Sequence, residues 1–145
     1  MTVEPYSDRY FLDVVKLIEN FHKEAVCEYD NMLDPDALIE TIKAQAGVGT
    51  FLMIVDGVCQ GVLSGYIMKS PLNNRLIFQE VIWYVNKDHR GSGLKLLKEV
   101  ENSLKLSNVG IMIMAVLENS KTEKLKALYE KMGYKKMETH YVRSL

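Results

Sequence analysis

The sequence has little cysteine, no long apolar run and almost no net charge. Cys27 and Cys59 are its two cysteines, too few for a disulfide framework or a zinc site. No apolar stretch approaches the length of a membrane span, and residues 1–10 lack the basic-then-apolar pattern of a signal peptide. Eighteen basic and nineteen acidic side chains leave a formal charge of −1, which argues against general attraction to nucleic acid or lipid. We therefore expect a cytoplasmic protein with no metal.

The 145 residues are enough for one domain, which we place at 1–145, and 48% of them are hydrophobic, enough for a sizeable core. Their charge is unevenly distributed. Residues 1–50 hold ten acidic and four basic side chains, whereas residues 87–145 hold twelve basic and seven acidic ones. This asymmetry suggests a cationic ligand near the first part and an anionic ligand near the last. Solvated charged surfaces on helices would explain it equally well.

Periodicity and turn residues predict an α/β or α+β domain with a mixed, mostly antiparallel sheet of six to seven strands and four helices. Asp34-Pro35 is a helix-start signal, and Asp56-Gly57 is a hairpin signal. The expected order is β-α-α-β-β-β-α-β-α-β-β. Strands are expected at 2–6, 50–55, 58–68, 76–85, 109–117, 134–136 and 138–142, and helices at 7–23, 35–46, 94–104 and 121–132.

A short glycine-containing string, Arg90-Gly91-Ser92-Gly93, lies between an expected strand and an expected helix. Glycines allow a tight turn whose amide groups point outward, and the helix start adds a positive dipole end, so the string suits a phosphate. A purely structural turn is the alternative. The Rossmann pattern is absent because Leu96 holds its third glycine position, and no Walker sequence occurs.

Glu80 precedes this string by ten residues, in the strand 76–85. Counting by twos places it on one face with Phe78, Ile82 and Tyr84. A carboxylate on an apolar face is desolvated, which raises its pKa and suits a general base. Two alternatives remain open: a bulge could turn Glu80 toward water, or Gln79 could be the residue that faces the cleft.

The last expected helix ends in residues 128–134, Leu-Tyr-Glu-Lys-Met-Gly-Tyr. Tyr129 lies on its apolar stripe and is expected to be buried, where its hydroxyl requires a hydrogen-bond partner.

Residues 83–94, Trp-Tyr-Val-Asn-Lys-Asp-His-Arg-Gly-Ser-Gly-Leu, resemble the acetyl-CoA loop of the GNAT N-acetyltransferase superfamily. Residues 127–134 resemble the closing helix-and-strand motif of the same family, and the element order agrees with the GNAT fold. The resemblance implies acetyl-CoA as co-substrate, a direct transfer to a primary amine without metal, Glu80 as general base and Tyr129 as the acid for the leaving thiolate. It also implies cofactor contacts from Trp83, Tyr84, Val85, Arg90, Gly91, Ser92, Gly93, Leu94, Lys95 and Asn119.

Two positions depart from the family pattern. Lys95 stands where the family usually has Gly or Ala, and Asn119 lies about one helical turn further from Tyr129 than usual. The partner is expected to be a small-molecule or peptide amine, and a homodimer is left open. The alternatives are a GNAT-fold module that binds CoA or a partner without catalysis and a toxin-like acetylase of aminoacyl-tRNA. Near-neutral charge argues against RNA. An acetyl-enzyme on Cys27 or Cys59 would contradict direct transfer.

Overall fold

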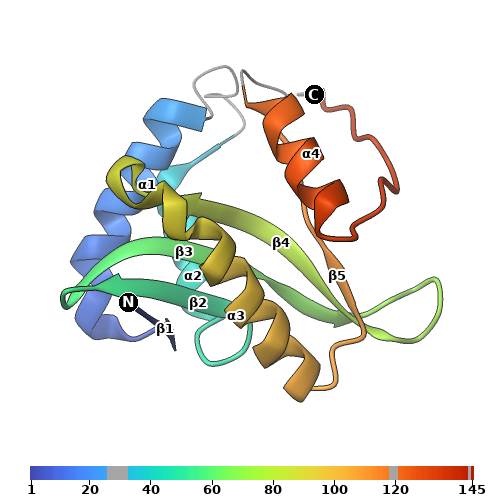
Figure 1. Cartoon of the computed structure of the whole chain (residues 1–145), viewed down its shortest axis with the longest axis horizontal. Helices are drawn as coiled ribbons and strands as arrows, with labels where there is room; N and C mark the ends of the chain where they lie inside the picture. Colours follow the sequence, from blue (N-terminus) through green and yellow to red (C-terminus); the bar gives the residue numbers. More distant parts are fainter. Residues whose placement is uncertain (26–32, 118–120, 144) are drawn as a thin grey trace. The chain divides into compact units, whose positions relative to one another are not determined.

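The computed structural model describes residues 1–25, 33–117, 121–143 and 145, and the chain forms two compact units, Met1–Met114 and Ala115–Leu145. The first unit holds a sheet with helices on both of its faces (Figure 1). Its elements are β1 Thr2–Pro5, η1 Asp8–Tyr10, α1 Phe11–Ala25, α2 Pro35–Ala44, β2 Thr50–Val55, β3 Val58–Lys69, β4 Leu76–Val85, η3 Lys87–Ser92, α3 Gly93–Leu106 and β5 Ile111–Ile113.

The two strongest local signals form the structures that the sequence predicts. The Asp34 side chain accepts a hydrogen bond from the Asp36 amide, and Pro35 opens α2 where its missing N–H costs nothing. Asp56 and Gly57 both have positive φ, at 50° and 78°, as a tight hairpin turn between β2 and β3 requires.

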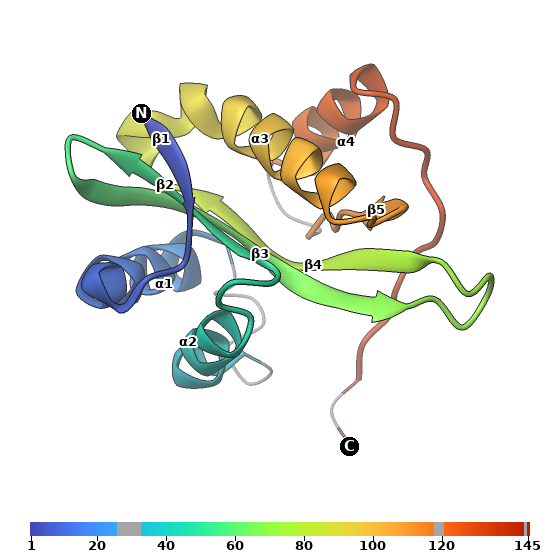
Figure 2. The ribbon, with the colours of Figure 1, turned by 90° about the horizontal axis from the view of Figure 1, so that it is seen from below.

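The strands run in the order β1-β2-β3-β4-β5. The first three pairs are antiparallel, and β4 pairs with β5 in parallel, from Ile77 opposite Ile111 to Gln79 opposite Ile113. In the view of Figure 2, α1 and α2 lie below β2–β4, and α3 lies above. The first unit is therefore a three-layer arrangement with a mixed sheet in the middle.

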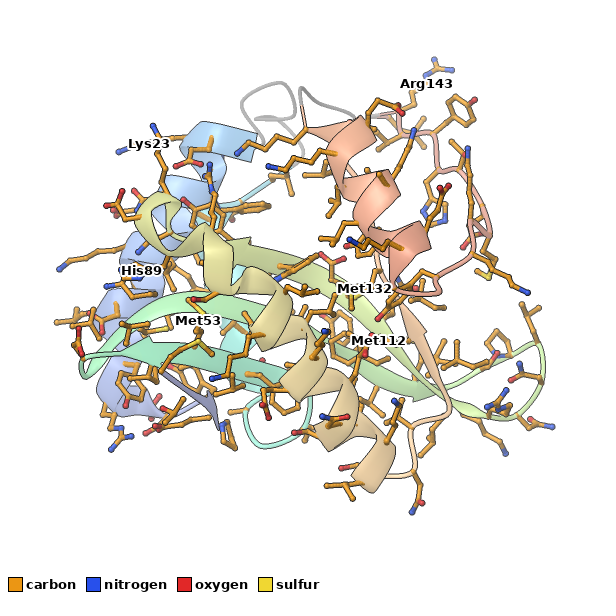
Figure 3. All side chains as sticks on the ribbon, in the orientation of Figure 1. Lys23, Met53, His89, Met112, Met132 and Arg143 are labelled. Carbon is orange, nitrogen blue, oxygen red and sulfur yellow. The ribbon has the colours of Figure 1, made fainter. Side chains whose placement is uncertain are left out.

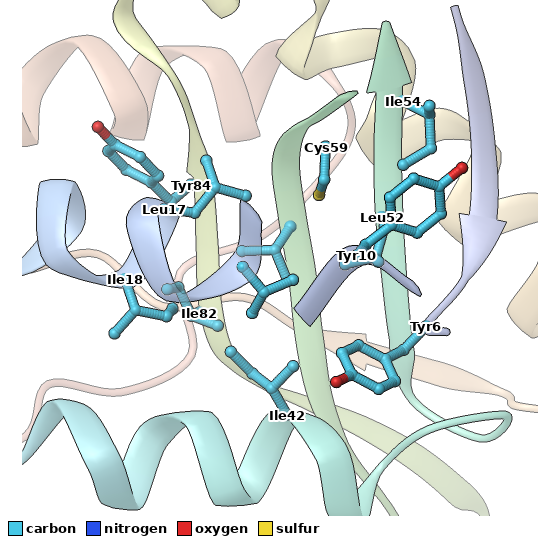
Figure 4. Packing of buried hydrophobic residues seen from close by; sticks show 12 residues of the cluster. Tyr6, Tyr10, Leu17, Ile18, Ile42, Leu52, Ile54, Cys59, Ile82 and Tyr84 are labelled. Carbon is cyan, nitrogen blue, oxygen red and sulfur yellow. The ribbon is translucent and has the colours of Figure 1, made fainter. Parts of the chain in front are cut away.

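A cluster of buried residues joins α1 and α2 to the lower face of the sheet (Figure 4). Leu17 and Ile18 of α1, Ile42 of α2 and Leu52 of β2 are completely buried in it. Met53 points to the opposite face because strand side chains alternate, and it is also completely buried (Figure 3). On that face, α3 buries its own apolar stripe, Leu96, Leu97, Val100 and Leu104.

The predicted number of strands was wrong for the described residues, which form five strands in place of six or seven. Residues 134–136 and 138–142 form no strand, and several of their side chains are exposed, with Tyr141 95% exposed. A strand needs a neighbouring strand to satisfy its backbone, and the described residues of the second unit form no strand that could pair with them. The strand expected at 109–117 is shorter in the structure, where β5 covers Ile111–Ile113 and lies at one end of the strand order.

The second unit contains α4, Thr122–Lys131, followed by Gly133 at φ +90°. This left-handed residue ends the helix as the sequence predicts. Among the residues that the structure describes, no helix has the length and apolar character needed to cross a membrane.

Candidate active site

A β-bulge in β4 sets the direction of the Glu80 side chain. Ser64 of β3 lies opposite Ile82, but Gly65 lies opposite Glu80, so Val81 is an extra residue without a counterpart. A bulge of this kind reverses the alternation of side chains beyond it. Ile82 and Tyr84 belong to the core cluster under α1 and α2. Trp83 faces the other way, because its ring would contact a Cβ placed on Gly93 of α3.

The face that carries Glu80 follows from the register of β3. Directly opposed residues in an antiparallel pair share a face, so Glu80 lies with Gly65, and Gly65 lies with Leu63 and its partner Trp83. Phe78 shares this face, since a Cβ on Gly65 would come within 2.6 Å of its Cζ. The prediction of a common face was therefore right for Phe78 and wrong for Ile82 and Tyr84.

The same register separates the two candidate bases. Glu80 lies on the α3 side and is half-buried, whereas Gln79 lies opposite Tyr66 on the other side. The backbone is unusually crowded there, since a Cβ on Gly65 would lie 2.3 Å from the Gln79 carbonyl oxygen. Gly65 also donates its amide to the Gly49 carbonyl at 3.0 Å. Glycine at 65 thus permits the close approach of β3 to β4 beside Glu80.

The β4 backbone after Gln79 pairs with a strand on one side. The β4–β5 ladder ends at Gln79 and Ile113. Apart from Val81, residues 80–85 pair with β3, with Trp83 opposite Leu63 and Val85 opposite Gly61, and the described residues supply no second neighbouring strand. The bulge at Val81 lies two residues after Gln79.

The glycine string forms a short 3-10 helix that leads directly into α3. The His89 amide donates to the Asn86 carbonyl at 2.8 Å, and the Gly93 amide donates to the Arg90 carbonyl. A Cβ on Gly91 would have open space around it. The first turn of α3 contains no acidic residue, and the Ser92 side chain does not cap it.

These features leave the first-turn amides of α3, those of Leu94 and Lys95 included, without intrahelical acceptors. The exposed Lys95 and Arg90 add positive charge at the same end. Amide donors with two cations suit a diphosphate, so the residues present fit the phosphate-bearing part of CoA. The Gly93 amide is the exception, because Arg90 already accepts its hydrogen bond.

Arg90 forms an ion pair that the sequence analysis did not predict. Its guanidinium donates to Glu24 near the end of α1, and the Tyr84 hydroxyl donates to the other oxygen of the same carboxylate at 3.1 Å. Burial first, and then Glu24, raises the pKa of Tyr84 to about 12. Phe21 packs edge-on against the Tyr84 ring at 5.8 Å. The sequence separation of 66 residues between Glu24 and Arg90 left no local signal of this contact.

Tyr129 belongs to the second unit and is buried there. Its hydroxyl donates to the Ala115 carbonyl at 3.2 Å, which is the kind of partner that a buried phenol requires. The Tyr134 ring lies 5.3 Å away, and the Tyr134 amide donates to the Tyr129 carbonyl at 3.0 Å. Asn119 and Cys27, also named from the sequence, lie outside the described residues.

The described residues contain no group of three or more His, Cys, Asp or Glu side chains placed to hold a metal. No protein-family model matches the sequence, and no curated protein is significantly similar to it.

Solved structures resemble the chain over its full length. A ribosomal-protein-alanine N-acetyltransferase from Brucella melitensis biovar Abortus 2308 superimposes with a TM-score of 0.76 at 16% identity, covering 99% of this chain and 98% of its own. The chain adopts the GNAT fold. A Trypanosoma brucei acetyltransferase has a TM-score of 0.73 at 17% identity, with 99% of both chains covered. An aminoglycoside acetyltransferase from an uncultured soil metagenomic sample, in complex with sisomicin, has a TM-score of 0.70 at 14% identity, covering 99% and 95%.

At these low identities the comparisons show the fold, and the chemistry has to be inferred from the residues of this chain. The order of elements through α4 agrees with the one that the sequence predicts.

Proposed function

We propose that residues 1–145 form a single GNAT domain that transfers an acetyl group from acetyl-CoA to a primary amine. The observation that carries the proposal is a juxtaposition within the first unit. Strand β4 carries the half-buried Glu80 and leads, through the turn that contains Arg90 and Gly91, directly to the amino-terminal end of α3. A ligand with a reactive acyl group at one end and a diphosphate further along it matches this order of a carboxylate and an anion site.

In the proposed reaction, acetyl-CoA supplies an acyl group that is already activated as a thioester. The amine nitrogen forms a bond to the acetyl carbon while the bond from that carbon to sulfur breaks. An alkylamine with a pKa near 10.4 is neutral in only about one molecule in 2,500 at pH 7, a penalty of roughly 4.6 kcal/mol. A positioned base contributes about 10²–10⁴-fold, which largely offsets that penalty. Glu80, half-buried at the bulge, is the residue that we assign as this base.

The departing thiolate needs a proton, and we assign Tyr129 as its donor. A thiolate whose thiol has a pKa near 8.5 is a moderately good leaving group, and a phenol with a pKa near 10 that is held against it can supply the proton, in a step about 1.5 pKa units uphill. Direct transfer also agrees with the state of Cys59, which is 2% exposed. Burial raises the pKa of its thiol to about 12, so it is a poor nucleophile for an acetyl-enzyme.

The acceptor is proposed to be a small-molecule or peptide amine. The sisomicin complex of the soil acetyltransferase shows that a protein of the same fold binds an aminoglycoside. The acidic first fifty residues of this chain would attract a cationic acceptor of that kind.

Two substitutions test the proposal, each with a matched control. Glu80→Gln and Tyr129→Phe should each lower the rate of CoA release from acetyl-CoA by about 10²–10⁴-fold, because each removes a group that transfers a proton. The affinity for acetyl-CoA should be largely kept. Glu99→Gln on the exposed side of α3 and Tyr141→Phe in the exposed tail should leave that rate unchanged. The assay is thiol release over a panel of primary amines, after calorimetric titration with acetyl-CoA and dephospho-CoA.

The outcomes separate the alternatives. Micromolar acetyl-CoA binding without turnover on any amine would favour a binding module. Absence of binding at millimolar acetyl-CoA would overturn the proposal. Full activity of both active-site variants would remove Glu80 and Tyr129 from the mechanism.

A further inference from the structure

Glu24 connects α1 to the turn that we assign to the cofactor diphosphate. One of its carboxylate oxygens accepts from the buried Tyr84 hydroxyl, and the other accepts from the Arg90 guanidinium. Tyr84 is 7% exposed and packs against Phe21, so the carboxylate is tied to the core of the first unit. The Arg90 and Glu24 side chains are 37% and 34% exposed, so a ligand in solution can reach this ion pair.

The pair matters because Arg90 is the cation of the glycine string. Arginine recognises phosphate through parallel N–H donors in a planar fork. In this structure, the Arg90 fork points to a carboxylate on α1 instead. A diphosphate carries more charge than one carboxylate and competes for the same donors. The Glu24 carboxylate contacts Arg90, so its negative charge lies close to the anion site and repels a phosphate bound there.

We propose that Glu24 is an affinity-determining residue that competes with the CoA diphosphate for Arg90. The inference rests on the proposed function. When the protein binds CoA, Arg90 turns from Glu24 to the diphosphate, and the measured affinity is reduced by the free energy of the broken pair. Because Glu24 also holds Tyr84, the exchange changes the surroundings of the Tyr84 ring on the α1 side of the sheet.

The sign of one substitution separates this role from a supporting one. Glu24→Gln keeps an oxygen that accepts from Tyr84 but removes the charge that holds Arg90. Competition predicts that CoA binds two- to fivefold more tightly, about the contribution of a partly exposed ion pair. A residue that merely supported the loop would weaken binding when replaced. Arg90→Gln should weaken binding about tenfold, the size expected for a charge-assisted contact to phosphate.

The experiment is calorimetric titration with CoA, which cannot be turned over, on the full chain at fixed low salt. Glu19→Gln is the control, since it removes the same charge from an exposed position earlier in α1. It should leave the affinity unchanged. In the Arg90→Gln background, adding Glu24→Gln should tighten binding less than it does in the wild type, because the competition for Arg90 is gone and only the repulsion between Glu24 and the phosphate remains. Circular dichroism melts establish that each variant is folded.

A second measurement follows the ion pair directly. The ring resonances of Tyr84, assigned with a Tyr84→Phe variant, should shift when CoA is added to the wild-type protein and shift less in Glu24→Gln. Unchanged or weaker CoA binding by Glu24→Gln, with Arg90→Gln impaired, would overturn competition and leave the proposed function intact. CoA binding by Arg90→Gln with wild-type affinity would do the same. Failure of the wild-type protein to bind CoA would overturn the proposed function and this inference with it.

Discussion

Gly65 shows how one missing side chain can determine the position of a functional group. A Cβ at this residue would lie 2.3 Å from the Gln79 carbonyl oxygen and 2.6 Å from Phe78 Cζ, both on the neighbouring strand. Neither contact can be relieved by a flexible side-chain end, since one atom is backbone and Phe78 is completely buried. Alanine at 65 would have to push β4 away from β3 at the pair formed by Gly65 and Glu80.

We expect Gly65→Ala to lower the free energy of unfolding by about 1–3 kcal/mol, as overpacking of a tight interior does. Urea denaturation measures this loss. Gly91→Ala is the control, because its added methyl group meets open space. Its free energy of unfolding should stay within about 0.5 kcal/mol of the wild-type value. Equal stability of Gly65→Ala and wild type would mean that β3 and β4 can move apart beside the bulge without lowering the free energy of unfolding.

At the scale of elements, α2 is attached to the sheet by a buried pair of hydroxyl groups. The Thr50 hydroxyl donates to the Ile42 carbonyl at 2.8 Å, and it lies 2.6 Å from the Ser64 hydroxyl. Thr50 and Ser64 are 1% and 0% exposed, so water cannot replace these bonds. The pair connects the last turn of α2 to β2 and β3.

Thr50→Val should therefore reduce the free energy of unfolding by about 1–3 kcal/mol, since the valine has the same shape but leaves the Ile42 carbonyl without its donor. Thr41→Val is the matched change in α2, at a more exposed hydroxyl that bonds within its own helix. It should cost no more than about 0.5 kcal/mol in the same denaturation experiment. A loss for Thr50→Val no greater than that control would show that the buried pair does not hold α2.

Prediction from sequence succeeded for elements whose signals are local. Asp34-Pro35 and Asp56-Gly57 carry their turn chemistry within a few residues, and both formed as predicted. The bulge at Val81 has no such signal, because it depends on the close approach of Gly65 from another strand. Strict alternation along β4 therefore placed Phe78 correctly on the face of Glu80 but placed Ile82 and Tyr84 there wrongly. The strands expected after Gly133 were also wrong, since a short polar segment does not specify its pairing partner.

The residues of the candidate site also fall into those that have a local sequence signal and those that do not. The glycine string, Glu80 and Tyr129 could be named from the sequence because each lies in a recognisable local pattern. The contacts of Glu24 with Arg90 and Tyr84 could not, since they join α1 to residues 60 or more positions away. The only indication of these contacts in the sequence was the excess of acidic side chains in its first fifty residues. Charge composition indicates the sign of a neighbour but not its identity.

At the scale of the whole molecule, three buried or partly buried donors make folding sensitive to alkaline pH. Burial is the first cause in each case, and it raises the pKa values of Tyr6, Cys59 and Tyr84 to about 12. Their ordinary values are 10.0 for the tyrosines and 9.0 for the cysteine. Each group stays protonated in the folded state at a pH where the unfolded chain has released its proton.

The sign of the effect follows from linkage between protonation and folding. The stability that each protonated group contributes is fully present below its ordinary pKa. It is lost progressively as the pH rises from that value to about 12, because the unfolded state then binds fewer protons than the folded one. The contribution of these three groups to the free energy of unfolding should thus be constant up to about pH 9 and decrease at higher pH.

Cys59→Ala isolates one part of this loss. The substitution removes a side chain that titrates, so the variant should lose less stability than the wild type between pH 8 and pH 10.5. The difference in free energy of unfolding between the wild type and Cys59→Ala should decrease by at most about 2 kcal/mol over that range, as expected for a thiol whose pKa is raised from 9.0 to about 12. Urea denaturation at matched ionic strength measures both curves. Parallel curves would mean that the Cys59 thiol is ionised in the folded protein as easily as in the unfolded chain, and its burial beneath α1 would then have no part in the alkaline limit.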